Sequence, residues 1–347
     1  MSYKFSRRQV LKLGAAAPAA IALSKFSIPA ASAATTPATG PGGVPPHGVP
    51  FRKKGLGYAG PPKTLTTPQE ISNYLSEGIS RVESLNPVWY YTWGPTPLTG
   101  LSQDPDFVPM VWGGKYPDEV PNQIAEVQAY ANGETLPVIL GFNEPDNVAQ
   151  SDMTVQQALS LWPEVAALAL EAVSPAPVHP FGEWFPDFFA QANPKPNYVA
   201  VHSYPGPTVD LPARIPISEL AGQFLGEIEQ VFQTYGLPIW ITEFAVADWA
   251  NPTKTLTNGL PSGNCYTSGD VVRFMQLVLP ELERRPYVER YAWFGAGPAA
   301  AISPALYPSA LFDTNGNLTP PGELYAQFGP PATSPVQGHA DSHAGPH

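Results

Sequence analysis

Short apolar runs recur along the chain and alternate with stretches in which apolar residues return every three or four positions. Runs of this length that are rich in β-branched and aromatic residues and bounded by turn residues are typical of strands. The intervening three- and four-residue spacing is typical of amphipathic helices. Eight strands are predicted, at residues 54–59, 87–93, 107–113, 137–142, 172–176, 198–204, 238–244 and 288–294.

The helical spacing is clearest before the second, fourth, fifth, seventh and eighth of these strands. Before the last strand, for example, apolar residues occupy Val271, Phe274, Val278 and Leu282. Strands that alternate with helices favour a parallel sheet with helices on its outer side, and eight such units favour a closed barrel. The sequence therefore predicts an α/β fold, namely a single (β/α)8 TIM barrel.

The predicted barrel is framed by segments of other composition. Residues 1–34 read as a cleaved twin-arginine export signal, because SRRQVLK at 6–12 precedes a short apolar stretch and then ASA at 31–33. Residues 35–53 are rich in Pro, Gly and Thr and predict a linker. The catalytic domain is expected at 54–328, and a disordered tail at 329–347.

Composition narrows the function. A net charge of −11 with only 14% charged residues disfavours nucleic-acid binding, which requires basic patches. The single cysteine, Cys265, excludes an intrachain disulfide, and without clustered Cys or His residues we expect no metal and no cofactor. The 8 Trp, 15 Tyr and 16 Phe suit a neutral polysaccharide, whose rings stack on aromatic faces, although many of them must fill the core. The apolar stretch of the signal is too short for a membrane span, so we expect no membrane contact in the mature form. We also expect the protein to be a monomer.

Two glutamates carry the candidate chemistry. Glu144 follows the fourth predicted strand and Glu243 ends the seventh, so both should lie at the carboxyl-terminal mouth of the barrel. Glycoside hydrolysis needs two carboxyl groups, one to protonate the leaving oxygen and one to attack the anomeric carbon. Asn143, directly before Glu144, can hydrogen-bond a sugar 2-hydroxyl.

Five segments together resemble glycoside hydrolase family 128, over about residues 54–328. They are VWYYTWGP at 88–95, VPMVWG at 108–113, LGFNEPD at 140–146, WITEFA at 240–245 with Asp248 and Trp249, and YVERYAWFG at 287–295. The resemblance implies retaining hydrolysis of β-1,3-glucan, most simply endo-acting, with Glu144 as a protonated general acid/base and Glu243 as an ionised nucleophile. Ser203 stands where the family has Trp, and Thr92 where it has Asn, and both departures are expected to alter the glucan subsites.

Further residues are expected to bind substrate. His202 and Tyr204 lie two apart on one strand and so share a face. The other candidates are aromatic residues at or just beyond strand ends, with Trp293 as the sugar platform: Trp93, Trp112, Trp249, Trp293 and Tyr58.

Other functions remain open on the sequence alone. A related barrel glycosidase could act on cellulose, mannan or xylan through the same carboxylate pair. A glucan-binding barrel without turnover is a third possibility, which the presence of both carboxylates and Asn143 disfavours. A covalent intermediate could also be intercepted by a sugar, giving transglycosylation.

Overall fold

The computed structural model describes residues 53–58, 66–102, 105–250, 256–257, 260–261, 263–296 and 303–329. The predicted export signal, the linker up to residue 52 and the tail from residue 330 lie outside these residues. Among the described helices, none has the length and hydropathy needed to cross a membrane.

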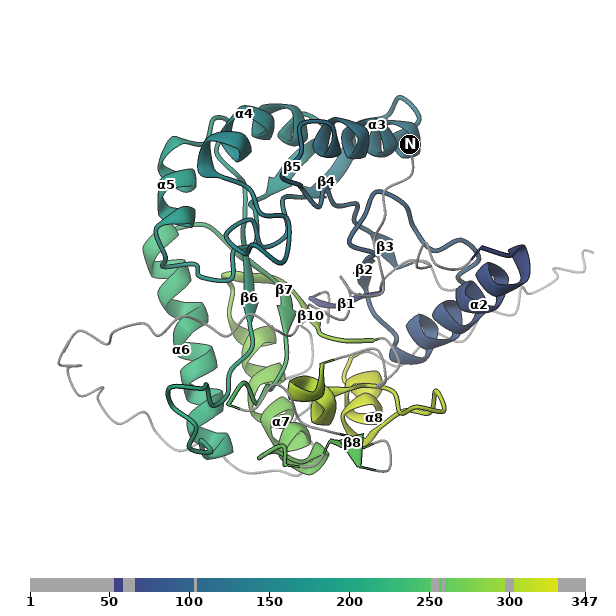
Figure 1. Ribbon diagram of the computed structural model, residues 1–347, viewed down its shortest axis with the longest axis vertical. Coiled ribbons are helices and arrows are strands. Elements are labelled where there is room, and N and C mark those ends of the chain that lie inside the picture. Colours follow the sequence, from purple (N-terminus) through teal and green to yellow (C-terminus); the bar gives the residue numbers. More distant parts are fainter. Residues whose placement is uncertain are drawn as a thin grey trace, which may run out of the picture.

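Eight parallel strands form a ring (Figure 1). Six of them make one sheet in the order β3-β2-β1-β10-β7-β6, and β4 pairs with β5. The isolated parallel bridges Met110↔Leu140 and Val173↔Tyr198 join this pair to the two edges of the sheet, so the ring closes and the predicted α/β barrel is confirmed. The strands are β1 (Lys54–Gly57), β2 (Trp89–Tyr91), β3 (Asp106–Phe107), β4 (Leu136–Leu140), β5 (Ala169–Val173), β6 (Val199–Ser203), β7 (Ile239–Phe244) and β10 (Val288–Trp293).

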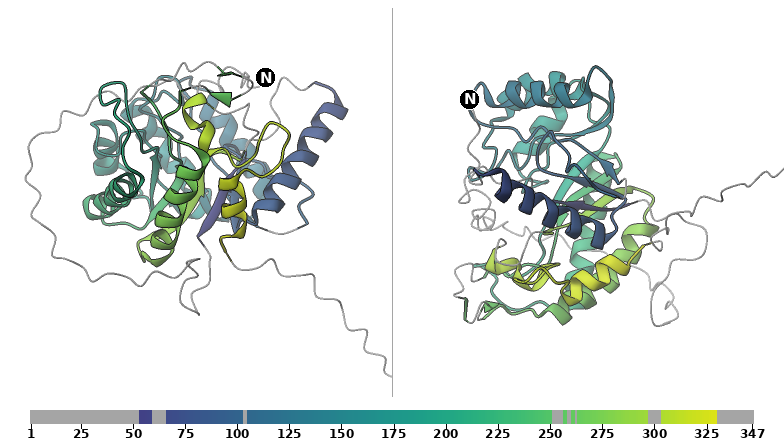
Figure 2. Two further views of the ribbon diagram at one scale, coloured as in Figure 1. Left: turned by 90° about the horizontal axis from the view of Figure 1, so that it is seen from below. Right: turned by 90° about the vertical axis from the view of Figure 1, so that its right-hand side faces the viewer.

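Helices surround the ring (Figure 2). Three of them begin with a capping box, in which a Thr side chain accepts from the third helical N–H and that residue's side chain returns a hydrogen bond. The helices are α2 (Pro68–Leu85), α3 (Glu119–Ala131), α4 (Val155–Ala166), α5 (Trp184–Gln191), α6 (Ile217–Tyr235), α7 (Ser268–Arg284) and α8 (Pro320–Gln327). A short hairpin of β8 (Leu256–Thr257) and β9 (Leu260–Pro261) precedes α7, and the 3₁₀ helix η2 (Pro304–Ser309) precedes α8.

Prolines shift two strand boundaries from the predicted ones. Proline has no N–H for the ladder, so a proline can interrupt a strand, although β4 continues through Pro137 near its start. Pro109 divides the predicted third strand into β3 and a segment that returns to the ring through Met110. The fifth strand begins earlier than predicted and ends before Pro175, although Ala176 still bridges Asn143.

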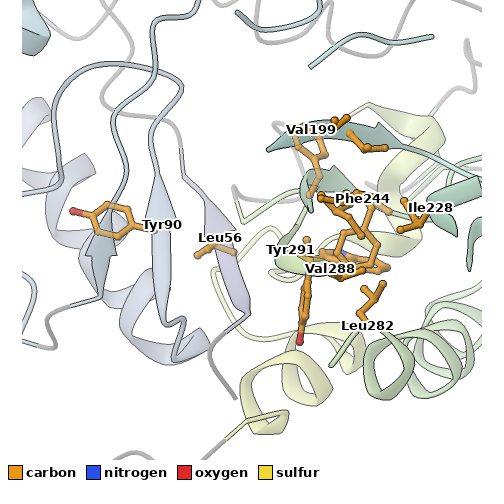
Figure 3. Packing of buried hydrophobic residues seen from close by; sticks show 14 of the residues in the cluster. Leu56, Tyr90, Val199, Ile228, Phe244, Leu282, Val288 and Tyr291 are labelled. Carbon is orange, nitrogen blue, oxygen red and sulfur yellow. The ribbon is translucent and has the colours of Figure 1, made fainter. Parts of the chain in front are cut away.

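The apolar core has two layers. The outer layer fills the space between strands and helices, and Figure 3 shows part of it, including Leu56, Phe244, Val288 and Tyr291. The inner layer fills the barrel itself: Trp89, Tyr91, Val108, Met110, Leu140, Val173, Ala176, Ala200, Trp240 and Ala292. Alternation along each strand assigns neighbouring residues to opposite layers.

The inner side of β1 carries no side chains. A Cβ on Gly55 would lie 2.1 Å from the indole of Trp89, and one on Gly57 would lie 2.5 Å from that of Trp93. Aromatic rings from β2 and the residues after it therefore occupy the space that β1 leaves empty.

Candidate active site

Backbone hydrogen bonds on both sides hold Glu144 at the mouth of the barrel. The N–H of Asn143 donates to the carbonyl of Trp112 (2.9 Å), and the N–H of Glu144 donates to that of Ala176 (2.8 Å). Glu144 has φ +42°, in the left-handed region that non-glycine residues seldom adopt. Such a conformation persists only where the surroundings impose it, and it is concentrated at functional sites.

A β-bulge directs Glu243 into the same mouth. Between Val201↔Ile241 and His202↔Glu243, β7 advances two residues while β6 advances one. Against β10 the register shifts in the same place, between Tyr291↔Ile241 and Trp293↔Phe244. Simple alternation would put Glu243 on the side of Ile241, which packs in the outer layer. A bulge re-aims a side chain in this way.

Both oxygens of Glu243 accept hydrogen bonds from aromatic side chains. Trp93 Nε1 donates to Oε1 (2.7 Å), and the hydroxyl of Tyr204 donates to Oε2. The indole N–H is only a donor, and an ionised carboxylate is only an acceptor, so the contacts suit the charged form of Glu243. On the other carboxylate, Asn147 Nδ2 donates to Oε2 of Glu144 (3.0 Å).

His202 lies between the two carboxylates. Its Nδ1 is 3.0 Å from Oε1 of Glu144 and 3.5 Å from Oε2 of Glu243. One ligand atom from each of the three side chains lies within 4.8 Å of the other two. The two carboxyl groups are therefore closer than the roughly 6.5–9.5 Å that an inverting glycosidase needs for its water, and near the 5–5.5 Å of retaining enzymes.

For Glu243 and for His202, burial and a neighbouring opposite charge shift the pKa in opposite directions. Burial raises the pKa of the Glu243 carboxyl, and the charge of Glu144 adds to this. The imidazole of His202 and the donors Tyr204 and Trp93 act in the opposite direction. Burial alone would lower the pKa of His202, but the negative charges of Glu243 and Glu144 and the hydrogen bond to Glu144 raise it.

Several of the predicted aromatic residues gather around this pair. Trp249 Nε1 donates to the Tyr204 carbonyl (3.1 Å), and the two rings meet edge to face at 6.0 Å. Trp93 lies against Tyr91, with ring centroids 4.7 Å apart. Trp112 is partly buried, and its carbonyl holds the N–H of Asn143 as described above.

Trp293, expected to be the sugar platform, does not face the barrel mouth. It is fully buried in the outer layer, where its ring meets Phe244 edge to face at 4.9 Å and its Nε1 donates to Ser309 O (2.9 Å). Because Ala292 faces the barrel interior, alternation turns Trp293 outward and Phe294 inward. Phe294 instead meets Trp93 edge to face at 5.9 Å.

Tyr58 is also displaced from its expected place. It is buried behind β1 against α2, with its hydroxyl 3.4 Å from Nη1 of Arg81 and its ring beside Gly78. The cause is again alternation, since the neighbouring Gly57 faces the interior. Tyr58 therefore contributes to helix packing and does not line the mouth.

The two departures from the family pattern act away from the carboxylates. Ser203 points outward between its inward neighbours, and its hydroxyl donates to Oε2 of Glu227 on α6 (2.6 Å). Thr92 is buried and its hydroxyl donates to the Thr96 carbonyl within the loop (2.8 Å). Ser203 therefore faces α6 and Thr92 lies within the loop after β2, and the expectation that both departures alter the glucan subsites stays a prediction.

Asn143 is fully buried beside Glu144. Among the described residues neither Oδ1 nor Nδ2 of its amide has a hydrogen-bond partner. An unpaired buried amide is destabilising by about 1–3 kcal/mol, which a ligand hydroxyl or a water molecule can offset.

Two site residues were not predicted. Asn147 contacts Glu144, and its place three residues after that glutamate in a loop gives only a weak signal. Phe294 could have been found by extending the alternation of β10 from Ala292, had the face of Ala292 been known.

Comparison with known proteins gives a consistent result. Residues 72–325 match a family described as glycosyl hydrolase catalytic core, and residues 4–24 match a TAT (twin-arginine translocation) pathway signal sequence, which indicates export. Alkali-sensitive linkage protein 1 of Schizosaccharomyces pombe is 26% identical over 262 residues, covering 73% of this chain. The match spans only 41% of that relative's length.

Solved structures show the same fold. A GH128 subgroup I endo-β-1,3-glucanase from Amycolatopsis mediterranei, crystallised with laminarihexaose, superposes with TM-score 0.59 at 25% identity, covering 79% of this chain and 98% of its own. A GH128 subgroup III curdlan-specific exo-β-1,3-glucanase from Blastomyces gilchristii, in complex with glucose, superposes with TM-score 0.53 at 25% identity, covering 79% and 97%.

Proposed function

This chain belongs to the glycosyl hydrolase catalytic core family, and on that premise we propose that it is an exported, retaining β-1,3-glucanase with endo action. The observation that carries the proposal is the close approach of two buried carboxylates, Glu144 and Glu243, on either side of His202. Its substrates are β-1,3-glucan polysaccharide or oligosaccharides, and it acts as a monomer without a cofactor.

In the first step Glu243 attacks the anomeric carbon and forms a glycosyl-enzyme. The donors Trp93 and Tyr204 hold its two oxygens, so that the carboxylate is both oriented and kept ionised. Glu144 gives its proton to the departing sugar oxygen, which makes that oxygen a better leaving group. The short separation of the carboxyl groups leaves no room for an inverting water between them.

In the second step Glu144, now ionised, takes a proton from water as the water attacks the glycosyl-enzyme. The fixed contact from Asn147 keeps its carboxylate in place through both steps. In this mechanism Asn143 donates to the sugar 2-hydroxyl, a contact that satisfies its unpaired amide and strengthens in the transition state.

The substrate assignment rests on relatives of the same fold. The Amycolatopsis enzyme is crystallised with laminari-oligosaccharides after replacement of one or the other of two glutamates. The two lie almost as far apart in that sequence as Glu144 and Glu243 do here. Relatives with endo and exo action are both present, and we favour endo action because the endo-acting subgroup I enzyme superposes with TM-score 0.59, against 0.53 for the exo-acting subgroup III enzyme.

Product analysis tests the proposal. Wild-type protein, Glu144→Gln and Glu243→Gln are incubated with linear β-1,3-glucan, and with mannan and carboxymethyl cellulose as controls. We expect a series of β-1,3-oligosaccharides from the wild type alone. Release of products from another polymer would show that the enzyme acts on that polymer and not on β-1,3-glucan. No release from any polymer would indicate a glucan-binding barrel without catalytic activity.

Azide rescue separates the two roles. In Glu144→Ala, azide should react with the glycosyl-enzyme and give the β-glycosyl azide, because two inversions occur. In Glu243→Ala, azide replaces the nucleophile directly and should give the α-glycosyl azide. The opposite pattern would exchange the roles of the two glutamates.

A further inference from the structure

We propose that Gly57 is a positioning residue for Glu243, because the space left by its missing side chain admits the Trp93 indole to the carboxylate. The kinetic part of this inference rests on the proposed function, whereas its structural part does not. Gly57 ends β1 and pairs in register with Tyr91 of the neighbouring strand.

The space beside Gly57 is occupied by the indole. A Cβ at position 57 would lie 2.5 Å from Cη2 and 2.9 Å from Cζ2 of Trp93, and 3.0 Å from Cζ of Tyr91. Contacts this short do not persist between carbon atoms, so one of the groups must move. Tyr91 is fixed by a hydrogen bond from its hydroxyl to the Thr242 carbonyl (2.9 Å). The indole is therefore the group that must shift.

The indole has little freedom to shift and keep its function. Tyr91 packs on it at 4.7 Å between ring centroids, and Phe294 meets it edge to face. Its Nε1 reaches Glu243 Oε1 at 2.7 Å, so a displacement of a few tenths of an ångström lengthens that bond or turns it out of line. Trp93 also has φ +53°, a left-handed conformation that a bulky residue adopts only when its surroundings impose it.

Gly57 acts through space, and not through backbone freedom. It does not belong to the glycines with positive φ in the described chain, so alanine is compatible with its backbone. Gly226 in α6 offers a matched control, since a Cβ there would meet nothing within 4 Å. Both substitutions add one methyl group, and Gly226→Ala also raises helix propensity in α6, so the control should leave Tm unchanged or slightly higher.

The first test is a thermal-stability cycle of wild type, Gly57→Ala, Trp93→Phe and the double variant, with Gly226→Ala as control. Phenylalanine lacks the outer indole atoms that a Cβ at 57 would meet. We therefore expect Gly57→Ala to lower Tm in the wild-type background and to lower it much less in Trp93→Phe, where only the 3.0 Å approach to Tyr91 remains. An equal loss in both backgrounds would overturn the proposal, because the obstruction would then lie elsewhere. This cycle requires no catalytic activity, and the double variant keeps the test open if Gly57→Ala alone fails to fold.

The second test follows the hydrogen bond directly. With ¹⁵N-labelled tryptophan, the Trp93 indole N–H resonance, assigned by its loss in Trp93→Phe, should follow the titration of Glu243 in wild type and Gly226→Ala. In Gly57→Ala it should move upfield and lose this titration. An unchanged resonance would overturn the proposal even if the protein proved to have no hydrolase activity.

The third test is kinetic. A hydrogen bond to a charged group contributes enough that its loss should lower kcat/KM by about tenfold to a hundredfold in Gly57→Ala and Trp93→Phe alike. The acid limb of the pH profile should move to higher pH in both, because the carboxylate loses a donor. In the double variant the two effects should not add, and full additivity would show that Gly57 does not act through Trp93.

Discussion

The Nδ1 atom of His202 lies 3.0 Å from Oε1 of Glu144, and the same nitrogen is 3.5 Å from Glu243. One imidazole is thus shared by the two carboxylates that we propose as acid/base and nucleophile. The charge of His202 stabilises the ionised form of Glu243 against the burial that opposes it.

Replacing His202 by asparagine should therefore change the pH dependence of catalysis. The variant lacks the charge that lowers the pKa of Glu243, so Glu243 should ionise at higher pH. The acid limb of kcat/KM against pH should move upward, while the fold remains intact by circular dichroism. A loss of activity that is uniform across pH would instead indicate that His202 only binds substrate.

The two aromatic residues at the end of β10 should separate stability from binding. Trp293→Ala removes a fully buried ring and should lower the free energy of unfolding by about 3–5 kcal/mol. Phe294→Ala, beside Trp93 and Tyr204, should raise KM for laminari-oligosaccharides with a smaller loss of stability. Denaturant titration and steady-state kinetics on both variants check this. The reverse result would restore Trp293 as the platform.

Chelation should leave activity unchanged. Glu144, His202 and Glu243 are close enough to ligate a metal ion, but oxygens of both carboxylates already accept hydrogen bonds from Asn147, Trp93 or Tyr204. Those contacts orient the carboxylates for acid–base and nucleophilic work without an ion. Dialysis against EDTA followed by assay is the measurement. A loss of activity that Zn²⁺ or Ca²⁺ restores would contradict the proposed mechanism.

Lys54 should make stability depend on pH near neutrality. Its buried ammonium donates to the carbonyls of Leu85 and Tyr325, and burial lowers its pKa to about 7, with partial compensation from Glu283. Between this value and the unfolded value of 10.5, the unfolded chain binds a proton that the folded chain does not, so stability rises with pH. The full gain is on the order of 4–5 kcal/mol.

Comparison with Lys54→Met isolates this contribution from the other groups that titrate in the same range. Guanidinium unfolding at pH 7 and pH 10 should show a larger gain of stability with pH in wild type than in the variant. Equal gains would mean that Lys54 keeps an ordinary pKa in the folded chain.

Much of the barrel could be predicted from sequence, because most strands are short apolar runs and most helices have apolar residues at every third or fourth position. The positions of Glu144 and Glu243 at strand ends followed from the same pattern. The sequence could not predict which side chains of each strand point into the barrel and which point toward the helices. The bulge at Glu243 adds a residue to β7 without any local sequence signal. It is visible only in the pairing of β7 with β6 and with β10, where the register shifts at this point.

The same uncertainty about side-chain direction explains why two residues predicted to line the mouth lie elsewhere. Trp293 and Tyr58 lie at strand ends as expected. Successive side chains of a strand point to opposite faces, so both residues point toward the helices while their neighbours point into the barrel. That choice depends on which neighbours fill the barrel, such as Ala292 and Gly57, and hence on packing between strands far apart in sequence. Phe294 entered the site through the same packing, whereas Asn147 lies in the loop after Glu144 and reaches that carboxylate locally.

The pairing of β1 with β10, in which Lys54 lies opposite Tyr291, has a consequence for how the chain is made. The first strand cannot find its second neighbour until the last strand has been synthesised, so the ring closes only after nearly the whole domain has left the ribosome. Contacts between such distant segments slow folding, because a long loop must be ordered before they form. The twin-arginine route, which carries folded proteins, allows time for that closure before the chain leaves the cytoplasm.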